Sequence, residues 1–188
     1  MREDITNPEV LASMCAATDQ NEVLIRPTEE TPKVESKHWL DPMGGYIILE
    51  KKPEKSYRIF TDLVAHGIPG LIISRVYPEK LKKKYKLAET PMLWLSRAEV
   101  KNAINPDDLL KLRYIVEDFA RKNEDSVILL DGLEYLITQN TFETAVKHLQ
   151  ELKDIIVLYN SRLIITLHRE TLEPKELSTL EREFTVVG

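Results

Sequence analysis

The residues best suited to chemistry stand in two short stretches, each placed where an apolar run gives way to a helical pattern. In the first, Leu49–Ser56 reads LEKKPEKS, so Lys55 and Ser56 fall on the last two positions of the phosphate-loop pattern GxxxxGK[ST]. In that pattern the lysine reaches the outer phosphates of a nucleotide and the hydroxyl binds magnesium. In the second, SVILLDGLEYL ends its apolar run at Asp131, the position of a magnesium-orienting acid. The two stretches follow the order of a nucleotide-phosphate site.

The first stretch departs from a working phosphate loop in its backbone. Both glycines of the pattern are replaced, by Leu49 and Glu54, and Pro53 restricts the turn further. Glu54 also brings negative charge to the place of the phosphate oxygens, which Lys51 and Lys52 offset only in part. Because side-chain charge cannot replace converging backbone amides, we expect a strand-to-helix turn with solvated lysines and no nucleotide cofactor.

Asp131 keeps two interpretations. It would position magnesium if Lys55 and Ser56 still held a phosphate group, which would make the chain a nucleotide-binding switch or ATPase. It would equally cap the helix expected to begin near Gly132, which is a structural role. Glu134 is a weaker candidate for a catalytic base, since an exposed or salt-bridged helical glutamate is the simpler interpretation.

Two further groups stand out by their charge. Arg75 follows the second expected strand, at the rim where open α/β sheets bind ligands, and an arginine there weakens the case for hydrolysis. The stretch PEKLKKKYK gathers Lys82, Lys83, Lys84 and two more lysines around Tyr85. Such a run would suit nucleic-acid phosphate, an acidic protein face or an anionic membrane surface, but most charge runs are solvated helix faces. The histidines are scattered and show no metal-ligand spacing, so we expect no metal site.

These residues need a sheet to position them, and the pattern from Pro42 onward indicates one. Short runs of Ile, Leu and Val alternate with stretches of helical period, which is typical of an α/β fold with a mostly parallel sheet between two helical layers. Helix starts are indicated at Asn105, and at Asn140 with Glu143 three residues on, as in a capping box. The expected strands are Tyr46–Glu50, Gly70–Ser74, Met92–Ser96, Val127–Asp131, Arg162–Leu167 and Phe184–Val187.

Residues 1–40 lack the regular alternation of apolar runs and helical stretches that begins at Pro42. A short apolar set includes Leu11 and Met14, which would share one face of a short helix, and a polar, proline-broken linker follows. Because an isolated helix of this length is marginal in water, its apolar face must pack on its own domain, a partner or a second copy. We therefore expect an amino-terminal helix and linker over 1–40 and one α/β domain over 41–188.

Composition limits the classes of function. A net charge of −5 and a pI near 5.5 argue against a dedicated nucleic-acid binder. The single Cys15 cannot form an intramolecular disulfide, and the sequence carries no signal-peptide order and no run long enough to cross a membrane. We expect a cytoplasmic protein without membrane insertion. The charged residues are mostly Lys, Glu and Arg, a balance typical of proteins from hot environments.

Several longer stretches carry a resemblance to a known family. YIILEKKPEKSYRIFTDLV, GLIISRVYPEKLKKKYKL and VILLDGLEYLITQNTFETAVKHLQELKD together resemble the archaeal domain-of-unknown-function 835 family, from about Gly44 to Phe184. That family has no assigned reaction, and its members are similar in order to recombinase-like ATPase domains of the RecA and KaiC type. The resemblance implies a three-layer, RecA-like fold and transfers no catalytic residue.

Together these observations favour a non-catalytic pseudo-NTPase domain that serves as a protein-interaction or regulatory module. Its contact surfaces would be the amino-terminal helix and the rim near Lys55, Arg75 and Asp131. Its partner would be another protein or a second copy of the chain. The alternatives are a nucleotide switch using Lys55, Ser56 and Asp131, or an accessory factor in a DNA or RNA transaction complex, which the acidic charge disfavours.

Overall fold

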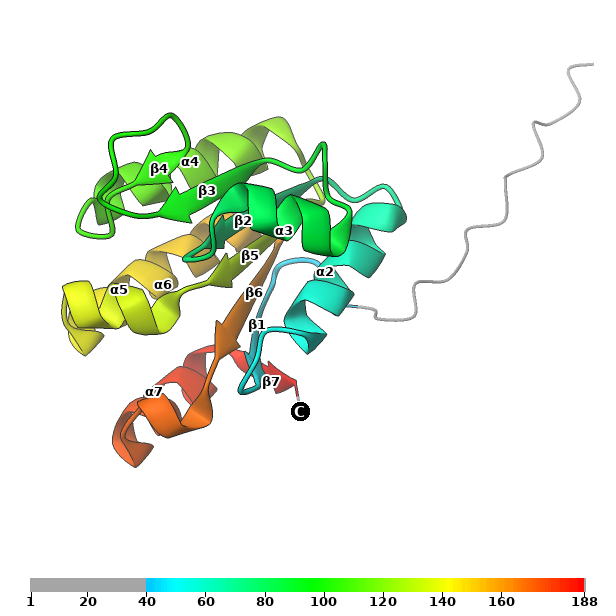
Figure 1. The fold of residues 1–188 in the computed structure, drawn as a ribbon. Coiled ribbons are helices and arrows are strands. Elements are labelled where there is room, and N and C mark those ends of the chain that lie inside the picture. Colours follow the sequence, from blue (N-terminus) through cyan, green and yellow to red (C-terminus); the bar gives the residue numbers. More distant parts are fainter. Residues whose placement is uncertain (1–39, 188) are drawn as a thin grey trace, which may run out of the picture. The chain divides into compact units, whose positions relative to one another are not determined.

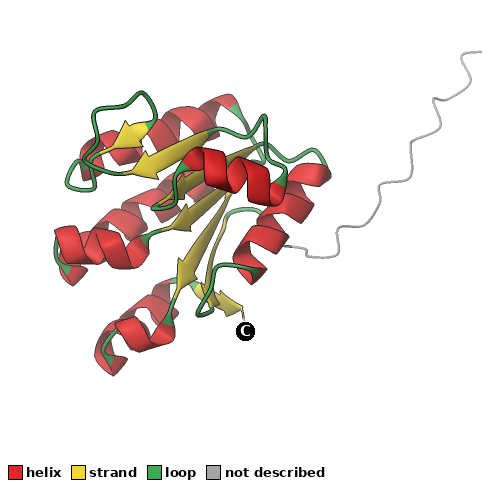
Figure 2. Ribbon diagram, in the orientation of Figure 1, coloured by secondary structure: helices red, strands yellow, loops and turns green. Residues whose placement is uncertain are grey.

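The computed structural model describes residues 40–187, which form an α/β domain (Figure 1). Within this range seven strands make one sheet in the order β4-β3-β2-β5-β6-β1-β7. All neighbouring strands run parallel. Helices lie on both faces of the sheet (Figure 2). The expected fold class is confirmed, and the arrangement is consistent with a three-layer RecA-like one.

The strands agree with the expected ones to within two residues at each end. One strand was not expected, because two residues are too few to carry an alternating pattern. This is β4, which extends the sheet beyond β3. The strands are β1 (Gly44–Leu49), β2 (Gly70–Ser74), β3 (Met92–Leu95), β4 (Ala103–Ile104), β5 (Val127–Asp131), β6 (Arg162–Leu167) and β7 (Thr185–Val187).

The helices divide between the two faces of the sheet. One apolar cluster packs the sheet against the first two helices, and a second packs the opposite face against the other four. The helices are α2 (Lys55–Ala65), α3 (Pro78–Tyr85), α4 (Leu109–Lys122), α5 (Leu133–Gln139), α6 (Phe142–Leu158) and α7 (Pro174–Glu183), with a 3₁₀ turn at Arg169–Thr171. In Figure 1, α2 and α3 lie in front of the sheet. We call this side the α2 face.

Strand alternation assigns each core side chain to one of these layers. In β5, Val127 and Leu129 belong to the cluster of α2 and α3, while Ile128 and Leu130 belong to the cluster of α4 to α7. Successive side chains of a strand point to opposite faces, so both faces of a central strand must be apolar. Each buried aliphatic side chain of this kind contributes about 1.5–3 kcal/mol to folding.

The start of α4 lies later than Asn105, so the expected cap is wrong. Asn105 instead accepts the Asp107 N–H at its side-chain oxygen, at 3.2 Å, and forms a turn before the helix. The actual cap is Asp108, whose carboxylate accepts the Lys111 N–H at 3.0 Å. Two cap-forming residues within one short stretch compete, and the sequence does not decide between them.

The cap of α6 is also displaced by one residue. Thr141 accepts the Thr144 N–H at 3.1 Å, so the expected capping box of Asn140 and Glu143 is wrong. Asn140 ends the preceding helix, where its side-chain amide donates to the carbonyls of Leu136 at 2.9 Å and Pro106 at 3.1 Å. It therefore joins α5 to the loop before α4.

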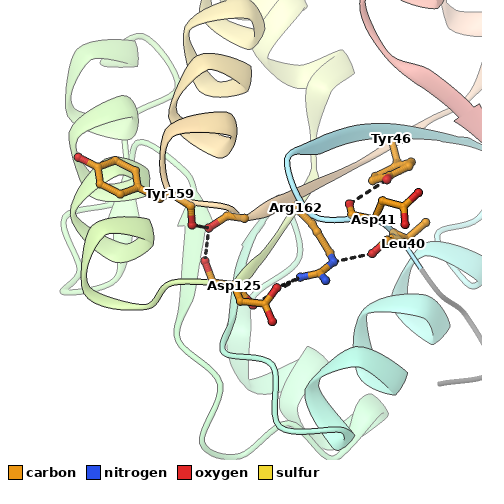
Figure 3. A network of polar contacts seen from close by, with 8 residues as sticks. Leu40, Asp41, Tyr46, Asp125, Tyr159 and Arg162 are labelled. Carbon is orange, nitrogen blue, oxygen red and sulfur yellow. Dashed lines mark hydrogen bonds and ion pairs between the residues drawn. The ribbon is translucent and has the colours of Figure 1, made fainter. Parts of the chain in front are cut away.

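A buried arginine closes the amino-terminal edge of the sheet (Figure 3). Arg162, the first residue of β6, donates from Nε to the Leu40 carbonyl at 2.6 Å and from Nη1 to the Asp125 carboxylate at 2.6 Å. Beside it, the hydroxyls of Ser126 and Ser161 lie 2.8 Å apart. A charge buried this deeply requires such partners, and here they tie the start of the domain to the loop before β5.

A buried histidine lies where α6 faces α4. His148 is almost fully enclosed, and its Nε2 has no hydrogen-bond partner within residues 40–187. The pKa of His148 is lowered to about 4, chiefly by burial; the Glu151 charge opposes this shift and the Arg113 charge adds to it. The ring is therefore neutral near pH 7 and packs as part of the core.

Candidate functional site

The turn between β1 and α2 is organised by the carboxylate of Glu50. One of its oxygens accepts the N–H groups of Glu54 at 3.0 Å and Lys55 at 2.7 Å. The other accepts the Ser56 N–H at 3.1 Å and the Ser56 hydroxyl. The Glu54 N–H is shared with the Lys52 carbonyl at 2.7 Å. Glu50 thus caps α2 from outside the helix.

This carboxylate occupies the position that an anion would take at a helix N-terminus. The first amides of a helix point outward without partners, and the helix dipole favours negative charge there. Phosphate loops bind phosphate with these same groups. In this chain they converge on a side chain of the protein itself, and the buried Ser56 hydroxyl donates to it as well.

Asp131 lies at the end of β5 and accepts three hydroxyl hydrogen bonds. Its Oδ2 accepts from Tyr57 at 2.8 Å and Ser74 at 2.9 Å, and its Oδ1 accepts from Thr166 at 3.1 Å. The interpretation of Asp131 as a helix cap is wrong, since α5 begins after Gly132 without a side-chain cap. Its observed role is to join α2, β2, β5 and β6.

Tyr57 connects this carboxylate to α3. Burial raises the pKa of Tyr57 far above its ordinary value, and the Asp131 charge raises it further, so the hydroxyl stays protonated and donates. The Tyr57 ring stacks on Tyr85, with centroids 4.4 Å apart and planes 7° from parallel. The Tyr85 hydroxyl donates to the Pro53 carbonyl at 3.2 Å, which fixes α3 against the turn.

Strand alternation explains why these polar groups meet, and most of them were missed in the sequence. Ser74, Asp131 and Thr166 follow by two positions Ile72, Leu129 and Ile164, which face α2 and α3. Glu50 likewise follows Ile48. All four therefore point to the α2 face at the carboxyl-terminal edge of neighbouring strands. Following every second residue of each apolar strand to its carboxyl-terminal end would have identified them.

Arg75 makes its contacts with neighbouring residues on the same edge of the sheet. Its backbone N–H donates to the Asp131 carbonyl at 3.1 Å, and its guanidinium donates to the Leu95 carbonyl. The guanidinium carbon lies 3.9 Å from the centre of the Tyr135 ring. Gly132 permits this arrangement, because a Cβ there would lie 2.7 Å from a Leu95 methyl group. Arg75 and Asp131 are thus brought together, as the sequence predicts.

The lysine run forms the exposed side of α3. Lys82 pairs with Glu79 at 3.1 Å, Lys83 is exposed, and the Lys84 ammonium lies 4.8 Å from the Tyr85 ring centre. The Tyr85 contact with Pro53 brings the carboxyl-terminal end of α3 beside the turn that carries Lys55. The predicted contact residues Leu11 and Met14 lie outside the described residues.

Sequence comparison identifies the family of this chain. A family model described as a protein of unknown function (DUF835) matches residues 49–184, which is most of the chain. This chain belongs to the DUF835 family. The DUF835 match contains the capped turn, the lysines of α3 and the Asp131 hydrogen bonds. No curated protein matches the chain.

Among residues 40–187, no three His, Cys, Asp or Glu side chains lie close enough together to hold a metal ion. None of the helices in the described part of the chain is both long and apolar enough to cross a membrane.

Proposed function

We propose that this DUF835 domain is a non-catalytic relative of RecA-like phosphate-loop NTPases and serves as a protein-interaction or regulatory module. One observation carries the proposal: the Glu50 carboxylate occupies the α2 amides that would hold phosphate. A nucleotide would have to displace this carboxylate and then remain beside its charge. The parallel sheet, the turn after β1 and the acidic end of β5 support the kinship.

The groups that would hold magnesium also have other partners. The Ser56 hydroxyl donates to Glu50, and Asp131 accepts from three hydroxyls. Magnesium requires near-octahedral oxygen coordination and gives up its water reluctantly. Recruiting Ser56 and Asp131 would mean breaking four hydrogen bonds around one fully buried and one half-buried side chain. This argues against the alternative of a nucleotide switch using Lys55, Ser56 and Asp131.

Titration calorimetry with the magnesium salts of ATP and GTP tests the proposal, together with a phosphate-release assay. We expect no binding heat, no thermal stabilisation and no hydrolysis at millimolar nucleotide. Binding to the folded state alone would necessarily stabilise the domain, by about 2.7 kcal/mol at a hundredfold excess over Kd. Hydrolysis that Lys55→Ala abolishes would overturn the proposal.

Glu50→Ala is the matched variant for the same measurement. If Glu50 blocks an otherwise competent amide cluster, its removal allows weak binding of inorganic phosphate or nucleotide where the parent shows none. Circular dichroism and the unfolding midpoint establish that the variant is folded. Nucleotide binding by the parent that Glu50→Ala leaves unchanged would place the nucleotide elsewhere and refute the role given to Glu50.

A further inference from the structure

A small pocket lined with aromatic side chains opens beside α3, on the rim that carries Arg75. Its volume is about 200 Å³, and it is lined by Tyr77, Pro78, Glu79, Trp94, Val100, Lys101 and Asn102. Tyr77 is 47% exposed and Val100 is 52% exposed, so apolar surface faces solvent here. Sites for whole small-molecule ligands usually measure about 300–1,000 Å³. This pocket is instead of a size to take one apolar side chain.

The two aromatic rings are held in place before any partner arrives. The Trp94 indole N–H donates to the Arg75 carbonyl at 3.0 Å, and Tyr77 meets Trp94 edge to face, with centroids 5.2 Å apart. Fixed aromatic side chains lose little conformational entropy on binding. Tyrosine, tryptophan and arginine are also the residues that most often dominate binding energy at protein interfaces.

Several lysines lie close to the pocket. Lys101 lines it, and Glu79, the acidic residue of its lining, is paired with Lys82 at 3.1 Å. Lys80 and Lys84 follow Tyr77 by three and seven positions, which places them along one side of α3, and both are exposed. A row of ammonium groups therefore leads from the pocket toward the turn after β1.

We propose that this surface binds a short acidic segment of a partner protein. One aliphatic or aromatic side chain of the segment enters the pocket, and its carboxylates lie along Lys80, Lys84 and Lys101. This proposal rests on the protein-interaction role proposed above and specifies the chemistry of the partner, an acidic peptide with one apolar side chain. Charge complementarity selects the occupant, because the chain is acidic overall and yet carries four lysines on this short helix.

Two other anionic partners fit the surface less well. Nucleic-acid interfaces favour arginine, whose planar fork grips phosphate, whereas the cations of α3 are all lysines. A membrane surface favours apolar side chains that protrude into the lipid, whereas Tyr77 and Trp94 line a hollow. A peptide carrying both an apolar anchor and carboxylates matches both features.

Fluorescence anisotropy with a labelled peptide of glutamates around a central leucine tests the inference. We expect saturable binding that weakens as salt increases, and a peptide with serine in place of leucine should bind several-fold more weakly. Lys80→Glu combined with Lys84→Glu should weaken binding by about tenfold or more, roughly 1.4 kcal/mol. Val100→Ser, which leaves the charges intact, should weaken it through the pocket alone.

The control reverses the same number of charges elsewhere on the domain. Lys147 on α6 and Lys175 on α7 are exposed, so the pair Lys147→Glu and Lys175→Glu gives the same net charge. The inference fails if the glutamate–leucine peptide does not bind, or if both charge-reversed pairs lose binding equally. It also fails if a single-stranded oligonucleotide or phosphatidylserine vesicles bind more tightly than the peptide.

These outcomes are separable from those of the nucleotide experiment. The substitutions on α3 and at Val100 leave the Glu50 hydrogen bonds in place. Peptide binding can therefore fail while the domain still binds no nucleotide. That result would refute the proposed binding surface and leave the non-catalytic assignment in place. Nucleotide hydrolysis together with peptide binding would remove the non-catalytic assignment and leave the surface standing.

Discussion

Replacing His148 by methionine should remove a large part of the domain's sensitivity to mild acid. The folded domain holds this histidine with a pKa of about 4, below the unfolded value of 6.5. The unfolded chain therefore binds a proton at a pH where the folded domain does not. Stability must be lost as the pH falls from the unfolded value toward the folded one, and it is fully present above the unfolded value.

The size of the effect follows from the difference between these two pKa values. Each pKa unit corresponds to about 1.36 kcal/mol, so the full loss approaches about 3 kcal/mol below about pH 4. Between about pH 7 and pH 5 the same linkage relation gives a loss of about 2 kcal/mol from this residue alone. That is a substantial share of the roughly 5–15 kcal/mol by which domains are stable.

The measurement is the free energy of urea unfolding of the parent and of His148→Met, from about pH 7.5 to 5. Linkage predicts that the two plots of this free energy against pH diverge over this range. Methionine has a similar volume and no titrating group, so it should keep the packing against α4. The variant should lose about 2 kcal/mol less than the parent on acidification. His66→Gln, at the exposed residue that follows α2, controls for the removal of a histidine as such.

Parallel curves for the parent and His148→Met would refute the reasoning. They would mean that His148 gains a proton in the folded domain as easily as in the unfolded chain. Glu151 would then have to reach the ring and compensate for both burial and the Arg113 charge. Nuclear magnetic resonance titration of the His148 ring in the folded domain would identify that outcome directly.

Three further substitutions test other parts of the structure by urea unfolding. Glu50→Gln should lower the free energy of unfolding by about 2 kcal/mol, because a neutral amide is a poorer acceptor for the α2 amides; an unchanged value would contradict the cap. Arg162→Met should cost about 2–3 kcal/mol, less than for a fully buried pair, since the Asp125 side chain is 54% exposed; a gain in stability would refute its anchoring role. Gly45→Ala should cost about 1–3 kcal/mol, because its Cβ would lie 2.6 Å from the Phe184 ring; an unchanged value would show that the ring can shift freely.

The sequence predicts the sheet well because strand identity depends on local apolar runs. Gly70–Ser74, Val127–Asp131 and Arg162–Leu167 match the expected strands residue for residue. Their near-continuous Ile, Leu and Val content is what burial on both faces demands. The two-residue β4 carries no such pattern, since its place in the sheet depends on pairing with β3. It could not be predicted from its own residues.

The candidate site was predicted only in part. The missing glycines and Pro53 predict a turn that does not wrap phosphate. In the structure Lys55 and Ser56 begin α2, and Asp131 ends β5. What fills the turn depends on Glu50, which the phosphate-loop pattern treats as an unspecified position. Alternation along the strands brings Glu50, Thr166 and Asp131 to one edge, but the hydrogen bond to Tyr57 depends on how α2 packs. That contact spans 74 positions in the sequence.

The Glu50 carboxylate is an intramolecular competitor of any free anion that would bind the α2 amides. A phosphate from solution competes with a carboxylate held a few residues from the amides that both would use. Tethered groups reach local concentrations of at least about the millimolar range, and attachment at the end of a strand gives less freedom than a flexible linker. We therefore expect free anions to compete poorly for these amides as long as Glu50 holds them. A single substitution at one strand end would convert a closed turn into one that responds to its ionic surroundings.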